Sequence, residues 1–188
     1  MSLVSPFLKP LQIAVNRYSD YDPEVPKQLA RMEGRVIELH FQQLELSLYM
    51  IISADGLDID MALSGVVENS LFLENGNDGM DISWSPIVIR NIESANNGDK
   101  CLSVGERSTP LVYDTILRGC PIGIAVKDAS HAKLERVQFE TNGTAVSAYI
   151  KKPFFGEPSV SITESTFKGN REKTLALSGA VITIDSAQ

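Results

Sequence analysis

Apolar and polar residues alternate in short runs over residues 54–185, and turns rich in Asn, Gly and Asp separate the runs. Five runs share one pattern: "DGLDID", "DGMDIS", "KCLSVG", "IGIAVK" and "TAVSAY". They recur every 22 or 23 residues, with equivalent positions at Gly56, Gly79, Cys101, Gly123 and Ala145. Strict alternation of this kind predicts β-strands that bury one face.

A second strand follows each run within the same repeat. Its equivalent positions, spaced 22, 23, 22 and 28 residues apart, are Val67, Ile89, Val112, Leu134 and Ile162. The longest spacing contains the insertion "YIKKPFFGEP". A repeat of about 22 residues made of short strands and turns is typical of a solenoid and leaves no room for a crossover helix. We therefore predict a right-handed parallel β-helix of five to six rungs over residues 53–188.

Two columns of aliphatic residues are predicted to point into this β-helix. The first is Leu57, Met80, Leu102, Ile124 and Val146. The second, two residues further along each strand, is Ile59, Ile82, Val104, Val126 and Ala148. Each buried aliphatic side chain contributes roughly 1.5–3 kcal/mol, so stacked rungs hold a core without a globular centre. Asn69 and Asn91 are predicted to stack as a short ladder that ends at Asp114.

Residues 1–52 follow a different pattern. A first helix is predicted from apolar residues at helical spacing, namely Leu11, Ala14, Val15 and Tyr18. A second helix is predicted between Asp22, a suitable N-cap, and Gly34, a suitable stop. The period then becomes two in "RVIELHF" and "LELSLYM", which predicts a β-hairpin. We interpret residues 1–52 as a small α+β segment, and as the cap that covers the first open edge of the solenoid.

The net charge, the hydrophobic pattern and the first residues restrict the classes of protein to which this sequence can belong. A net charge of −7 argues against nucleic-acid binding, which needs clustered Lys and Arg. The sequence contains no stretch of about 18 apolar residues, so it predicts no transmembrane helix. The first residues lack the basic region and apolar core of a signal peptide. The sequence as it stands therefore predicts a cytoplasmic protein, or an extracellular one if an export segment has been removed.

Cys101 and Cys120 are the two cysteines of the chain. They do not occupy equivalent positions of the repeat, and the chain has no Cys/His cluster with the spacing of a zinc site. We expect both to be small packing residues near the corners of rungs, without a disulfide.

The runs "GDKCLSVGERS" and "GIAVKDAS" carry a resemblance to right-handed β-helix modules of the pectate lyase and polygalacturonase superfamily, over residues 54–185. Residues 14–52, "AVNRYSDYDPEVPKQLARMEGRVIELHFQQLELSLYMII", resemble the start of a sterol-carrier-type lipid-binding domain such as the ubiquinone-biosynthesis accessory factors. The second resemblance implies an isoprenoid or sterol-type ligand. The join near "IISADGLDID" then indicates a fusion, natural or chimeric.

The resemblance to polygalacturonases identifies two candidate catalytic carboxylates, Asp78 in "NDGMDIS" and Asp99 in "GDKCLSVG". Glycoside hydrolysis needs a pair of carboxyl groups, one as acid and one as base. Lys100 stands where the family has its next Asp, and "GCPIGIAV" has no His where the family has one. The resemblance therefore implies a hydrolase with an incomplete acid pair.

Other residues are candidates for binding a sugar. A polysaccharide lyase uses a cationic base beside Ca²⁺, and the basic residues Lys127, Lys151 and Lys152 lie near one edge of the rungs. Each of them also suits a solvated turn. Trp84 precedes a rung corner, where it either stacks on a sugar or packs against the protein.

Two columns of acidic residues are candidates for Ca²⁺. Asp55, Asp78 and Asp99 are predicted to stack at one turn, with Asp58 and Asp81 stacked on the neighbouring strand. Rungs lie about 4.8 Å apart, so these carboxylates repel one another unless water or a bound Ca²⁺ screens them. The C-terminal strand "GAVITID" has no polar cap after it, which predicts homodimerisation through that end.

These observations predict a carbohydrate-associated β-helix module without catalytic activity. Three alternatives remain open: a lipid-binding accessory protein, a degenerate polysaccharide hydrolase or lyase, and a chimera with no selected function.

Overall fold

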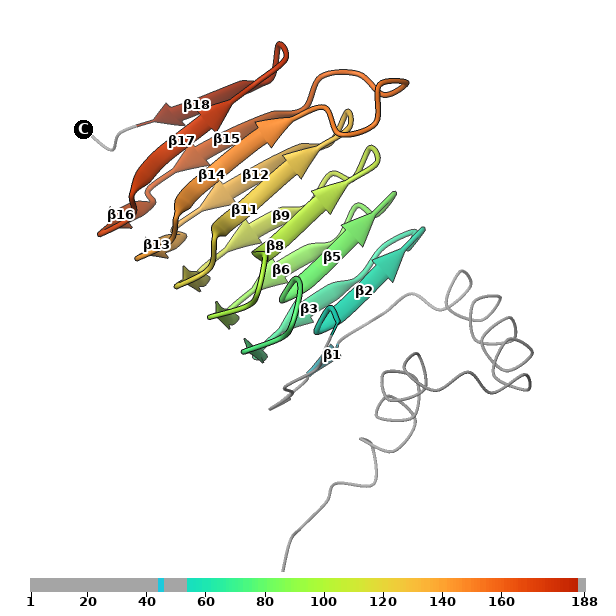
Figure 1. Ribbon diagram of the computed structural model, residues 1–188. Helices are drawn as coiled ribbons and strands as arrows, with labels where there is room; N and C mark the ends of the chain where they lie inside the picture. Colours follow the sequence, from blue (N-terminus) through green and yellow to red (C-terminus); the bar gives the residue numbers. More distant parts are fainter. Residues whose placement is uncertain (1–43, 46–53, 186–188) are drawn as a thin grey trace, which may run out of the picture. The chain divides into compact units, whose positions relative to one another are not determined.

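The computed structural model describes residues 44–45 and 54–185, which form a parallel β-solenoid (Figure 1). Every pairing between its strands is parallel, and the chain returns to the same sheet once per turn. Three sheets therefore run along the solenoid, and each complete rung contributes one strand to each of them. The predicted mainly β solenoid is confirmed.

The three sheets have the following strands. The six-stranded sheet consists of β2 (Leu57–Asp60), β5 (Met80–Ser83), β8 (Lys100–Gly105), β11 (Ile122–Lys127), β14 (Thr144–Tyr149) and β17 (Glu172–Ala176). The seven-stranded sheet consists of β1 (Leu44–Glu45), β3 (Val66–Glu68), β6 (Val88–Arg90), β9 (Leu111–Tyr113), β12 (His131–Glu135), β15 (Ser159–Thr163) and β18 (Val181–Asp185). The five-stranded sheet consists of β4 (Leu71–Leu73), β7 (Glu93–Ala95), β10 (Ile116–Arg118), β13 (Gln138–Glu140) and β16 (Thr166–Lys168).

The register confirms the predicted inward columns. Met80 pairs with Leu102, and Ile124 pairs with both Leu102 and Val146. These residues are fully buried, as are Ile82, Val104, Val126 and Ala148 of the second column. Stacked aliphatic side chains from all three sheets thus form one continuous core along the solenoid.

The corner between the seven-stranded and five-stranded sheets repeats one backbone conformation. Asn69, Asn91, Asp114, Arg136 and Glu164 have φ values of 52°, 50°, 50°, 50° and 49°. This left-handed region suits Asn best among residues with a side chain. The predicted ladder is confirmed, because the Asn91 Nδ2 donates to the Asn69 Oδ1 at 2.5 Å. It ends at Asp114, which pairs with Arg136 instead.

The expectation that the two cysteines stay unpaired is wrong. Cys101 and Cys120 form a disulfide, with their Cα atoms 5.7 Å apart. The repeat explains the pairing. A Cβ atom added to Gly56, Gly79 or Gly123 would lie only 2.7, 2.6 or 3.1 Å from the Nδ2 of an Asn 18 or 19 residues later, namely Asn75, Asn97 and Asn142. On one rung this Gly–Asn pair is replaced by Cys101 and Cys120, which are 19 residues apart.

Most predictions for residues 1–52 lie outside the described residues. This applies to both helices, to the first strand of the hairpin and to the boundary at residue 52. Within the second predicted strand, Leu44 and Glu45 pair in parallel with Val67 and Glu68 of β3. This part of the chain therefore already belongs to the solenoid. The described residues include no helix that meets the length and apolarity of a membrane span.

The last rung leaves apolar side chains exposed. Leu177 and Val181 are 48% and 54% exposed, and every residue of β17 is exposed. Dimerisation through this end stays a prediction.

Candidate functional site

The outward side of the six-stranded sheet carries three of the candidate residues, Asp58, Asp81 and Lys127. Its register continues the two aspartate positions Asp58 and Asp81 into Ser103, and then into the small residues Ala125 and Ser147. The next outward positions include Asp60, Ser83, Lys127 and Tyr149. We call this surface, from Asp58 to Tyr149, the outer sheet face. The predicted equivalence of Asp58 and Asp81 is confirmed.

Lys127 is the centre of the outer sheet face. Lys127 is only 5% exposed, although its position in the strand faces outward. The Nζ donates to the Ser103 Oγ at 2.7 Å. A Cβ atom on Gly105 would lie 3.8 Å from this Nζ, at ordinary van der Waals distance, so the lysine packs directly over the glycine. Burial lowers the pKa of Lys127, and the carboxylate of Asp81 acts in the opposite direction.

The ammonium group of Lys127 has no ion-pair partner among residues 54–185. Among the described residues, no carboxylate oxygen lies within 4.0 Å of its nitrogen. One oxygen of Asp81, the Oδ1, is likewise buried without a hydrogen-bond partner in the described part of the chain. Buried groups of this kind are unusual in a protein that uses them only for packing.

Carboxylates gather at the end of the outer sheet face formed by β2 and β5. Loss of surrounding water raises the pKa of Asp58 to about 7, and the negative charges of Asp60 and Asp81 add to this effect. Burial also raises the pKa of Asp60. Burial opposes ionisation of Glu106, but hydrogen bonds from Lys152 and Ser83 outweigh it and lower the pKa of Glu106.

The raised pKa of Asp58 makes stability depend on pH. An aspartate whose pKa rises from 3.8 to about 7 on folding binds its proton more tightly in the native chain. The native state therefore loses stability as pH rises from about 4 to 7, with no further loss above that range. We expect Asp58→Asn to reduce this loss. Because Asp58 is exposed, solvent screens most of the effect, and we expect a rise in melting temperature at pH 8 of only about 1–3 °C.

Thermal melts at pH 5 and pH 8 check this expectation. Glu140→Gln, which changes a carboxylate on the five-stranded sheet, is the control. The expectation fails when Asp58→Asn and Glu140→Gln have the same pH dependence as the unmodified protein.

The two candidate catalytic carboxylates meet at one lysine. Asp78 is buried, and its Oδ1 accepts hydrogen bonds from the Lys100 backbone nitrogen at 3.0 Å and from the Lys100 Nζ at 3.3 Å. The same Nζ pairs with Asp99. Burial raises the pKa of Asp78 while the Lys100 charge opposes the rise. Both carboxylates are thus bound by a buried cation, which fits a structural role better than that of an acid–base pair.

The predicted column of Asp55, Asp78 and Asp99 is wrong in its third member. The register that pairs Met80 with Leu102 places Lys100, and not Asp99, beside Asp78. Asp55 uses its Oδ1 to cap the next turn, since it accepts bonds from the Asn77 Nδ2 at 2.7 Å and the Asp78 backbone nitrogen at 2.8 Å. Among the described residues, no group of three or more His, Cys, Asp or Glu side chains is arranged to hold a metal ion.

Trp84 lies at the corner between the six-stranded and seven-stranded sheets, and the insertion at residues 150–158 folds onto it. The ring centroids of Trp84 and Phe155 are 5.7 Å apart, and the Arg107 guanidinium lies over both rings, at 5.3 and 5.7 Å. Phe154 packs beside Phe155 at 4.7 Å. We call Trp84, Arg107, Phe154 and Phe155 the aromatic corner.

Asp128 holds this insertion in place. The buried Asp128 Oδ1 accepts hydrogen bonds from the backbone nitrogens of Lys151 and Lys152, at 2.7 and 2.8 Å. The Lys152 side chain pairs with Glu106 on the same side. Lys152 is therefore held by Asp128 and Glu106, whereas Lys151 is exposed. Sequence reasoning missed Asp128, although the 28-residue spacing marked the insertion that it anchors.

Comparison with protein families supports the architecture. A family model described as a right-handed β-helix region matches residues 45–187. The chain belongs to this family. No curated protein and no solved structure shows significant similarity to it.

The family match supports the predicted architecture but none of the predicted functions. It covers the right-handed β-helix predicted for residues 53–188 and begins at Glu45 in β1. It says nothing of an activity or of a carbohydrate ligand. It does not extend over residues 14–44, so the sterol-carrier resemblance and the fusion stay predictions.

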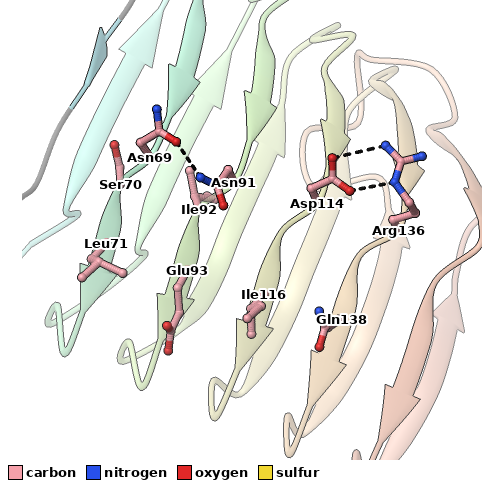
Figure 2. A pocket seen from close by; sticks show the side chains of 10 residues that line it. All are labelled: Asn69, Ser70, Leu71, Asn91, Ile92, Glu93, Asp114, Ile116, Arg136 and Gln138. Atoms are coloured by element: carbon pink, nitrogen blue, oxygen red, sulfur yellow. Dashed lines mark hydrogen bonds and ion pairs between the residues drawn. The ribbon is translucent and has the colours of Figure 1, made fainter.

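The β-helix has a hollow on another side. A groove of about 690 Å³ follows the corner between the seven-stranded and five-stranded sheets (Figure 2). Its lining combines the Asn69–Asn91 ladder with the Asp114–Arg136 pair and with the outward side chains of the five-stranded sheet. We call it the corner groove. Sequence reasoning found its ladder but not the hollow beside it.

Proposed function

We propose that the outer sheet face and the aromatic corner bind an acidic polysaccharide without hydrolysing it. The observation that carries this proposal is the exposed aromatic surface: Trp84 is 40% exposed and Phe154 is 78% exposed. Exposed aromatic rings beside charged groups are typical of binding surfaces, and a sugar ring stacks on them through its C–H groups. The exposed Lys151 supplies positive charge for a uronate carboxylate. The charge of the buried Lys127 adds to the positive potential from beneath this surface.

The shape of the β-helix supports a linear polymer as ligand. Equivalent outward side chains recur at each rung, about 4.8 Å apart. A chain that lies across the rungs therefore meets one outward position per rung, where the side chain changes from Asp81 to Ser103 and Ala125. The ion pairs of Lys100 with Asp78 and Asp99 argue against the acid–base pair that hydrolysis needs.

Calorimetric titration with oligogalacturonides tests this function. We expect Phe154→Ala to weaken binding about fivefold to tenfold, because a stacked aromatic contact contributes roughly 0.5–1.5 kcal/mol. Val181→Ala, which shortens an exposed apolar side chain on the last rung, is the matched control and should bind normally. Absence of binding across a panel of acidic polysaccharides, with and without Ca²⁺, contradicts the proposal.

A second candidate function is β-elimination of the same polysaccharide, favoured by the lowered pKa of the unpaired Lys127. In that reaction the neutral amine removes the proton next to the uronate carboxylate. A carbon–carbon double bond forms as the glycosidic oxygen leaves with the bonding electrons. Ultraviolet absorbance of the unsaturated product detects it. Lyase activity that Lys127→Met abolishes while binding persists supports this candidate, and absence of the absorbance excludes it.

A further inference from the structure

The corner groove runs across four successive rungs (Figure 2). Each rung supplies a corner residue and, two residues later, an outward side chain at the start of a strand in the five-stranded sheet. The pairs are Asn69 with Leu71, Asn91 with Glu93, Asp114 with Ile116, and Arg136 with Gln138. The groove is thus a linear, periodic surface on the side of the β-helix away from the six-stranded sheet.

The charged side chains of the groove are neutralised within the protein. The Arg136 Nε and Nη2 bind the two Asp114 oxygens at 2.7 and 3.3 Å. The Arg118 Nε, beside the groove, donates to the Glu93 Oε1 at 2.7 Å. A charged ligand would have to break these pairs to gain a partner, and a neutral ligand would not.

The remaining polar groups suit hydroxyl groups. The hydrogen bond of the ladder joins the Asn91 Nδ2 to the Asn69 Oδ1. The Asn69 Nδ2 and the Asn91 Oδ1 take no part in this bond and face outward. In the part of the chain that the structure describes, the exposed Gln138 amide makes no hydrogen bond. Donors and acceptors therefore alternate with two apolar side chains, Leu71, which is 39% exposed, and the partly exposed Ile116.

The spacing of the rungs distinguishes between two kinds of neutral linear ligand, an extended peptide and an oligosaccharide. An extended peptide advances about 3.3 Å per residue and repeats its side-chain direction about every 6.6 Å. Neither distance matches rungs that lie about 4.8 Å apart. A linear pyranose chain advances by nearly one rung per sugar, and it presents hydroxyl edges beside apolar C–H faces. We propose that the corner groove binds a neutral, linear oligosaccharide, one sugar per rung.

Calorimetric titration of the full chain with xylohexaose and cellohexaose tests the proposal. We expect one of them to bind, and we expect affinity to rise with the number of sugars up to four, the number of rungs that line the groove. Ile116→Arg should weaken binding at least tenfold by filling the groove, and Gln138→Ala should weaken it about threefold to fivefold through loss of a hydrogen bond. Lys133→Ala, an exposed change on the neighbouring seven-stranded sheet, is the control and should leave binding unchanged.

Several outcomes overturn the proposal: no binding by either hexasaccharide, binding that Ile116→Arg leaves intact, or tighter binding of an extended neutral peptide. The result is separable from that for the acidic polysaccharide. Phe154→Ala should leave neutral hexasaccharide binding unchanged, and Ile116→Arg should leave oligogalacturonide binding unchanged. Either site can therefore fail while the other is supported.

Discussion

Replacing Cys101 and Cys120 together by Ser is expected to lower the melting temperature by about 6–12 °C. The disulfide joins residues 19 positions apart. Closing a loop of this size constrains the unfolded chain by about 3 kcal/mol. In a domain of this length, each kcal/mol corresponds to about 2–4 °C in melting temperature. Melts of the unmodified protein with and without dithiothreitol check the same effect without a substitution.

The repeat supplies a sharper control for this experiment. The double variant Cys101→Gly with Cys120→Asn restores the pair found on other rungs, where Gly123 leaves room for the Asn142 amide. We expect it to melt above the double Ser variant, because the new Asn can bond to buried backbone groups as its equivalents do. Equal melting temperatures for the double Ser variant and the oxidised protein would show that the disulfide does not form or does not stabilise.

Asn142→Leu is expected to lower the free energy of unfolding by about 2–4 kcal/mol. Asn142 is buried, and its Oδ1 accepts from the Cys120 backbone nitrogen at 3.0 Å. Its Nδ2 donates to the Leu117 carbonyl at 2.9 Å and to the Asn170 Oδ1 at 3.0 Å. Leucine has a similar volume but leaves the buried backbone nitrogen of Cys120 unpaired, at a cost of about 1–3 kcal/mol. The bonds of the Nδ2 are lost as well, which adds about 1 kcal/mol, while the Leu117 carbonyl keeps its place in the sheet. Urea denaturation measures the change.

The matched control changes an asparagine that makes its ladder on the surface. Asn69→Ala removes the exposed bond to Asn91 and should cost about 1 kcal/mol or less. A cost for Asn142→Leu no greater than that of Asn69→Ala would contradict the importance that we assign to the buried amide.

Much of the architecture was predictable because a solenoid repeats itself. The columns at Leu102 and Ile124 follow from alternation and from the 22-residue spacing, and neighbouring rungs align the same positions. The Asn69–Asn91 ladder follows from the same spacing. The disulfide was also present in the pattern, since Cys101 and Cys120 have the separation of the neighbouring Gly–Asn pairs. This pairing is not visible when the strand positions of the repeat are compared only with one another.

The candidate site was less predictable. A shift of one residue replaces Asp99 by Lys100 beside Asp78, and this exchanges a repelling column for an ion pair. Spacing counted within a turn does not detect such a shift, because turns absorb single residues without disturbing the strands. The anchoring of the insertion likewise depends on contacts between rungs, since Asp128 binds the backbone of residues that follow it by 23 and 24 positions.

The sequence by itself determined the parallel β-helix, its rung length, its inward columns and the aspartates on its outer sheet face. These properties are local, since each depends on alternation within one strand and on a spacing repeated along the chain. Only the tertiary structure decided which charges are neutralised, which ammonium is left unpaired at Lys127, and where the corner groove lies. Ion pairing and burial depend on side-chain positions to within about 1 Å across neighbouring rungs, a scale that hydrophobic periodicity does not encode.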